Sequence, residues 1–193
     1  MPWQKQFDVD EALERAMQVF WTRGYEATSL QHLVTATGVN RASLYATYRD
    51  KHTLFLAALE RYEQEYRRRL MATLERTAPG LPAIRSVFQT FVDLTANSGD
   101  RKGCFLTNTA LECAAHDPKA ARIVARGQAE MEQFFARMII VGQTRGEIPP
   151  TVTPPVAASG LLAALLGLLV LVRSRPERAL LDQVVAGALA MLE

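Results

Sequence analysis

Residues 38–51, GVNRASLYATYRDK, mix hydrogen-bonding side chains of several kinds within one short polar stretch. Arg41 carries a planar fork that fits two acceptors on a guanine edge, and Asn40 matches the donor and acceptor pair of an adenine. Tyr45 and Lys51 carry groups that suit phosphate oxygens. The stretch therefore has the chemistry to contact nucleic acid, provided that one structural element holds these side chains together.

A helix-turn-helix is the element that the surrounding pattern predicts. Short helices over residues 29–36 and 40–46 are joined by a tight turn at Gly38. If Val39 and Leu44 point inward, Asn40 and Arg41 remain at the start of the second helix, which is the end that reaches base edges in a major groove. The predicted DNA contacts are Thr28, Ser29, Asn40, Arg41, Ala42, Ser43, Tyr45, Tyr48 and Lys51.

The same spacing also fits an ordinary helical hairpin with a polar outer face. The whole chain has a net charge of only +2, which permits nucleic-acid binding but does not require it. Within residues 38–52, Asp50 opposes Arg41, Arg49 and Lys51. Spacing and charge alone therefore leave both interpretations open.

Helix signals run through the rest of the chain, whereas strand signals are scarce, so the sequence predicts an all-α fold of about nine helices. Asp8 or Asp10 caps the first helix, Thr28 or Ser29 the second, and Asp50 a long fourth helix that ends before residue 78. The later helices are expected over residues 82–98, 104–115, 118–145, 156–174 and 177–192. We divide the chain into a head, residues 1–52, and a regulatory part, residues 53–193.

Charged residues on the long fourth helix form pairs four positions apart. Glu63 precedes Arg67 and Glu65 precedes Arg69 at this spacing, which favours ion pairs along one helix face. We expect this face to be solvated.

The helix expected over residues 156–172 is apolar on every side. It is at the lower length limit for a membrane span, and a buried core helix of a monomer has the same composition. We favour a third interpretation, in which the helix pairs with its two-fold mate and with the last helix. The predicted homodimer contacts are Leu162, Leu166, Gly167, Val170, Val184 and Ala188.

The N-terminal residues also carry a family resemblance. The order Gly24-Tyr25, Thr28, Gly38-Val39, Leu44-Tyr45, Tyr48, Lys51 and Leu54 resembles the signature of the tetracycline-repressor (TetR/AcrR) family of bacterial transcriptional regulators. The resemblance covers about residues 10–56. It departs at Thr37, Ala42 and Tyr48, where alanine, glycine and phenylalanine are usual, and these departures leave the operator sequence open.

The resemblance implies a cytoplasmic homodimer that grips a double-stranded operator, needs no cofactor and is not an enzyme. A small-molecule inducer would enter a pocket among the middle helices and move the two heads out of half-site spacing. Candidate pocket residues are Tyr66, Phe88, Phe91, Cys104, Asn108, Met131 and Phe134. The aromatic and methionine residues among them fit a solid core equally well.

Cys104 offers a second route to regulation. The segment Gly103-Cys104-Phe105-Leu106 resembles one found in family members that sense electrophiles by cysteine modification. Arg101, Lys102 and a helix start favour the reactive thiolate, although a buried and inert thiol fits the same sequence. Cys113 is expected inside the core.

Other chemistry has little support in the sequence. His32, His52 and His116 are scattered and lack the spacing of metal ligands. An enzyme that uses Cys104 with His116 as base lacks an evident orienting acid. Two cysteines do not make a disulfide framework, and the N-terminus has no export signal, so reduced thiols are expected.

Overall fold

The computed structural model describes residues 7–98 and 101–193, and in these residues it is all-α, as predicted. Nine helices result when α4, η1 and α5 are taken as one continuous helix and η2 as the last turn of α10. In chain order, the elements are α1 (Val9–Arg23), α2 (Leu30–Thr37), α3 (Arg41–Tyr48), α4 (Lys51–Tyr62), the π-helix η1 (Glu63–Arg68), α5 (Arg69–Thr77), α6 (Leu81–Ser98), α7 (Phe105–Glu112), α8 (Pro118–Thr144), α9 (Pro154–Ser174), α10 (Arg178–Leu189) and the 3-10 helix η2 (Ala190–Leu192).

Side-chain caps begin the helices where the sequence predicts them. Of the alternative residues, Asp8 caps α1 and Ser29 caps α2. Asp50 accepts the backbone N–H of Thr53 at 2.7 Å and starts α4, while Asp117 caps α8 ahead of a proline in its first turn. Each cap satisfies backbone donors that a helix start leaves without partners.

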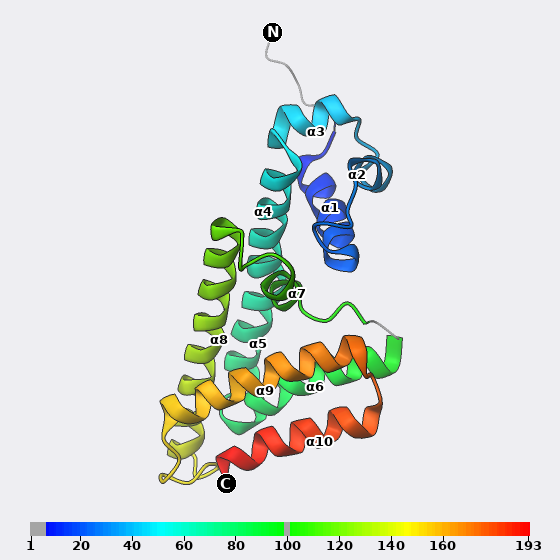
Figure 1. Ribbon diagram of the computed structural model, residues 1–193. Coiled ribbons are helices and arrows are strands. Elements are labelled where there is room, and N and C mark those ends of the chain that lie inside the picture. The colour runs from blue at the N-terminus through cyan, green and yellow to red at the C-terminus, as the bar shows by residue number, and fades with distance from the viewer. Residues whose placement is uncertain (1–6, 99–100) are drawn as a thin grey trace.

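The head consists of α1, α2 and α3, which gather at one end of the molecule around the first turns of α4 (Figure 1). Phe20, Leu33 and Leu44 are among its fully buried residues, and Phe55 of α4 packs edge-on against Phe20. Gly38 ends α2 in the left-handed region at φ 70°, which makes the tight turn into α3.

The helix formed by α4, η1 and α5 leads from the head into the body without a linker (Figure 1). The predicted boundary between residues 52 and 53 therefore falls inside α4. The solvated face predicted here is wrong for its central pair, since Glu63 is fully buried and Arg67 is 7% exposed. The reason is that α8 packs over this part of the helix and places Gly127 against the Glu63 carboxylate.

The body contains α6, α8, α9 and α10, with α9 packed against each of the other three (Figure 1). Leu161, Leu165 and Leu168 bury one side of α9, whereas Ala163 and Gly167 on the opposite side are exposed. By length and composition α9 could also cross a membrane, but a core helix of a soluble protein passes the same test.

Candidate nucleic-acid interface and central pocket

The start of α3 presents the polar side chains that the sequence places there. Asn40 is its N-cap, and its Oδ1 accepts the backbone N–H of Ser43 at 2.9 Å, which leaves the amide nitrogen to donate outward. Asn40, Arg41 and Ala42 are exposed, and Ser43 is half-buried. The Arg41 guanidinium lies 5.5 Å from the ring centroid of Tyr45, a cation–π distance that steadies the long side chain.

Two predicted contacts are buried instead. Thr28 is 1% exposed, and its hydroxyl donates to the Gly24 carbonyl at 2.6 Å. Tyr48 is 9% exposed and packs in the head core, with its hydroxyl 3.5 Å from the Val9 carbonyl. Both side chains pack within the head, and their hydroxyls are partly buried.

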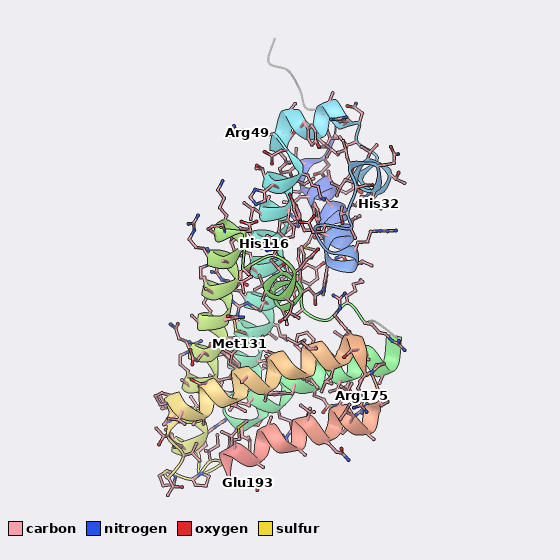
Figure 2. The ribbon with its side chains drawn as sticks, in the orientation of Figure 1. His32, Arg49, His116, Met131, Arg175 and Glu193 are labelled. Atoms are coloured by element: carbon pink, nitrogen blue, oxygen red, sulfur yellow. The ribbon has the colours of Figure 1, made fainter. Side chains whose placement is uncertain are left out.

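The remaining predicted contacts flank α3. Ser29 is exposed, although its hydroxyl accepts the backbone N–H of His32 in the capping box of α2. Lys51 begins α4, and its ammonium lies 4.3 Å from the ring centroid of Tyr25. Arg49, between α3 and α4, is exposed at the tip of the head (Figure 2).

A cavity of about 160 Å³ lies where the head, the π-helix and the body meet. Its aromatic lining is Trp21, Tyr62, Tyr66 and Phe91. Its aliphatic and sulfur-bearing lining is Leu70, Leu94, Met131, Leu165, Leu169, Val172 and Cys104, and the polar lining residues are Arg67, Thr90 and Thr95. The wall is predominantly apolar, which suits a small organic ligand.

Four predicted pocket residues line this cavity, namely Tyr66, Phe91, Cys104 and Met131, the last of which projects from α8 in the middle of the molecule (Figure 2). Phe88 and Phe134 are fully buried core residues. Asn108 lines a separate, more open hollow and donates to the Lys102 carbonyl at 2.8 Å.

The sequence analysis missed Trp21, which belongs to α1 of the head but lines the cavity. Its indole N–H donates to the Gly103 carbonyl at 3.1 Å, and its ring meets Tyr62 edge-on at 4.9 Å. A signal was available, because Trp21 is a large aromatic residue beside the core stripe of α1 rather than on it.

The two cysteines have different surroundings. Both are free thiols. Cys104 occupies the N-cap position of α7 in the cavity wall, and Cys113 follows the last turn of α7 outside that wall. Burial, with Glu112 and Asp117 nearby, raises the pKa of Cys113 to about 11. Burial also raises the pKa of Tyr62 far above its usual range, and the adjacent Cys104 side chain adds to this shift.

Polar contacts of Glu14 with Arg61 and Tyr66, here called the polar seam, join the head to the helix that carries the cavity. Glu14 of α1 accepts hydrogen bonds from the Tyr66 hydroxyl at 2.7 Å and from Arg61 Nε at 2.9 Å. Burial raises the pKa of Glu14, but the hydrogen bonds from Tyr66, Gln18 and Arg61 outweigh it, so the net pKa is lowered and the carboxylate stays charged. Tyr66 therefore touches both the cavity and α1.

Two further contacts tie the head to α7 and α8. The Glu112 carboxylate accepts the backbone N–H groups of Tyr25 and Glu26 at 3.0 and 2.9 Å. His52 Nε2 lies 2.7 Å from Asp117 Oδ2. A shift of α7 or α8 would therefore move the head through these contacts.

No group of three or more metal-ligating side chains occurs among the described residues. His32 sits on α2 and His116 just before α8, so the two histidines belong to different elements (Figure 2).

Comparisons with known proteins agree with this arrangement. Residues 12–58 match the family model for bacterial regulatory proteins of the tetR family, and residues 80–188 match the tetracyclin repressor-like C-terminal domain. The chain is 37% identical to the HTH-type transcriptional regulator YezE of Bacillus subtilis (strain 168), over 75% of this chain and 74% of that protein. It is 34% identical to the HTH-type transcriptional repressor ComR of Escherichia coli (strain K12), over 76% of this chain and 70% of that protein.

A solved structure extends the match to nearly the whole chain. A cysteine mutant of the TetR family regulator CifR, complexed with 26-bp double-strand operator DNA, has a TM-score of 0.85 and 27% identity. The match covers 99% of this chain and all of that one.

A helix-turn-helix head with an exposed recognition helix, carried on a helical body with a pocket, defines a DNA-binding transcriptional regulator. The chain belongs to the TetR family of bacterial regulatory proteins. Its relatives are regulators of transcription rather than enzymes.

Proposed function

We propose that this protein is a cytoplasmic repressor that a small apolar molecule releases from a palindromic operator. The observation that carries the proposal is the position of Trp21, a residue of the DNA-binding head that lines the cavity. A ligand in this cavity touches the head directly, so it can favour one head position over another. Only such a difference in affinity between two states moves a conformational equilibrium.

The proposed base contacts are the exposed residues at the start of α3. Arg41 donates a bidentate pair of hydrogen bonds to a guanine edge, and Asn40 donates to a base through its amide nitrogen. Ala42 and Ser43 lie against the major groove. Ser29, Tyr45 and Lys51 serve the phosphates on either side. Thr28 and Tyr48 support these residues from the core and are left out of the proposed contact set.

We propose a homodimer through the open side of α9 and α10. Ala163, Gly167 and Val170 of α9 are exposed, and a Cβ added at Gly167 or at Gly187 of α10 would meet nothing within 4 Å in the monomer. Of the predicted contacts, Leu162, Leu166 and Val184 are half-buried at the edge of this surface. Ala188 is 2% exposed and faces the core of its own chain, so it is not a partner contact.

Covalent modification of Cys104 is a second candidate for the releasing signal. Its sulfur shares the cavity wall with Trp21 and Tyr62, so bulk added there enlarges the side chain next to the head. Close-packed interiors do not absorb such bulk without movement of the surrounding helices.

Footprinting on the DNA upstream of the gene for this protein tests the proposal. We expect a protected region with two inverted half-sites separated by about one helical turn or a multiple of it. Protection that lacks inverted symmetry would contradict the dimeric operator complex, and no protection would contradict a repressor whose operator lies upstream of its own gene.

A further inference from the structure

The cavity matches a ligand of one aromatic ring. An apolar protein cavity of about 150 Å³ holds one benzene molecule, and the central cavity here measures about 160 Å³. Trp21, Tyr62, Tyr66 and Phe91 surround it with aromatic faces and edges. Aromatic rings pack well against such walls in edge-to-face or offset arrangements.

Most hydrogen-bond donors of the wall are already used within the protein. The Trp21 indole donates to Gly103, and the Tyr66 hydroxyl donates to Glu14. The Thr90 and Thr95 hydroxyls donate to backbone carbonyls of their own helix at 2.7 and 2.9 Å. The Tyr62 hydroxyl is hydrogen-bonded to the Cys104 side chain. A polar ligand group therefore has to find another donor.

Arg67 lines the cavity and is the candidate for that donor. Its Nε and Nη2 donate to the carboxylates of Glu63 and Glu130, and these contacts fix the guanidinium in place. Nη1 is 3.4 Å from the thioether sulfur of Met71, its only partner among the described residues. A thioether is a weak acceptor, and Nη1 carries two N–H groups, so capacity for an oxygen acceptor remains.

Charge decides which kind of acceptor fits. Glu63 and Glu130 balance Arg67 and Arg68 in one ion-pair cluster. A ligand carboxylate would add an unbalanced negative charge next to these two glutamates inside an apolar wall. A neutral carbonyl oxygen accepts the same hydrogen bond without that charge.

We propose that the pocket binds a small neutral aromatic carbonyl compound, with the ring between Trp21, Tyr62 and Phe91 and the carbonyl oxygen accepting a hydrogen bond from Arg67 Nη1. The inference deepens the proposed function, because the same compound acts as the inducer. It binds without forming a covalent bond and is independent of Cys104 chemistry.

Trp21 provides a direct binding signal. The chain has two tryptophans, so the Trp3→Phe variant leaves Trp21 as the single indole fluorophore. We would titrate this variant with acetophenone, with α-methylstyrene, in which a methylene group replaces the carbonyl oxygen, and with benzoate. The three probes share one ring and nearly one shape.

The comparison of the first two probes isolates the hydrogen bond. In a wall without a free donor, α-methylstyrene binds more tightly, because buried acetophenone loses the hydrogen bonds that its carbonyl makes with water. We expect acetophenone to bind at least as tightly as α-methylstyrene. Tighter binding of α-methylstyrene, or no binding of acetophenone, overturns the proposal.

Benzoate tests the preference for a neutral ligand. The Lys102 ammonium lies 5.2 Å from the centroid of the Trp21 ring and is the charge that would favour a carboxylate. We expect benzoate to bind at least about tenfold more weakly than acetophenone, since an unpaired charge is costly in an apolar wall. Benzoate binding as tightly as acetophenone overturns the charge argument.

The Arg67→Lys variant tests the donor itself and keeps the positive charge. We expect acetophenone to bind about tenfold more weakly to this variant, and α-methylstyrene to bind as before. Arg69→Lys is the matched control, because Arg69 lies on the same helix, is exposed and pairs with Glu65. Unchanged acetophenone binding in a folded Arg67→Lys variant overturns the assignment, and the probe series on the Trp3→Phe variant decides the ligand class if the Arg67→Lys variant does not fold.

Operator release is measured separately by gel shift. Acetophenone that binds without releasing DNA leaves the ligand class intact and contradicts its role as inducer. Release by compounds outside this class, with no binding of acetophenone, contradicts the ligand class and leaves the repressor function intact.

Discussion

Arg41 and Lys51 both belong to the proposed DNA-contact set, but we expect them to contact different parts of the DNA. Arg41→Ala should lose discrimination at one base pair, by about 1–3 kcal/mol, because a bidentate guanine contact disappears. Lys51→Ala should weaken binding to all sequences alike and reduce the salt dependence. Competition gel shifts with operator and random DNA at several salt concentrations measure both effects. An unchanged sequence preference in Arg41→Ala would show that α3 does not read the DNA through this residue.

Cys104 is a free thiol in the lining of the central cavity. An alkylating electrophile should release operator DNA from the wild type but not from Cys104→Ser, because the added bulk enters the cavity wall next to Trp21. Cys113→Ser should behave as the wild type, since burial and a pKa of about 11 keep this thiol protonated at neutral pH. Gel shifts before and after alkylation provide the measurement. Equal release from the wild type and from Cys104→Ser would reduce Cys104 to a packing residue.

The turn between α3 and α4 stores strain at Arg49. The backbone N–H of Asp50 donates to the Tyr48 carbonyl at 2.8 Å, which closes a γ-turn around Arg49 at φ 66° and ψ −51°. Residues other than glycine adopt this conformation only at a cost of on the order of 1–3 kcal/mol. The turn sets the angle between α3 and α4.

Replacement of Arg49 separates strain from charge. Arg49→Gly should have a free energy of unfolding about 1 kcal/mol above that of Arg49→Ala, because glycine tolerates positive φ and both variants lack the guanidinium. Urea denaturation of the two variants measures the difference. Equal stability would mean that the turn relaxes when the side chain is removed.

The π-helix η1 places both pocket and seam residues on one element. Tyr66 and Arg67 of η1 line the cavity, while Tyr66 also donates to Glu14 of the head. Single π-turns within α-helices occur frequently at functional sites. We therefore expect a bound ligand to shift this element first.

On the outside of the molecule, α9 and α10 expose apolar residues that the rest of the described chain does not cover. Gly167→Glu should produce monomers at micromolar concentration, because it buries an unpaired carboxylate at the proposed interface at a cost of several kcal/mol. The variant should remain folded, since a Cβ at Gly167 meets nothing within 4 Å in the monomer. Light scattering together with far-ultraviolet circular dichroism checks both points.

Ile140→Glu is the matched control for assembly. Ile140 of α8 is 53% exposed and lies outside the proposed dimer contacts, so this variant should remain a dimer. A folded wild-type monomer would contradict both the dimer and the palindromic operator.

The helix starts and the recognition helix could be predicted from the sequence because they depend on neighbours in the chain. A cap such as Asp50 or Asp117 acts on backbone groups two or three residues away, and both begin helices as expected. Asn40 and Arg41 are exposed for the same reason, since the spacing of Val39 and Leu44 decides which side of α3 is buried.

Tertiary structure decided which side chains other helices cover. Glu63 and Arg67 have the spacing of a surface pair, but α8 brings Glu130 and Gly127 over them. Trp21 joins a cavity whose other walls come from residues far along the chain, and Ala188 turns to its own core while Gly167 and Gly187 stay open. Local hydrogen bonds are set within about one helical turn, whereas burial depends on partners distant in sequence. The sequence by itself determined an all-α regulator with a helix-turn-helix head, and packing between helices distant in sequence determined its pocket.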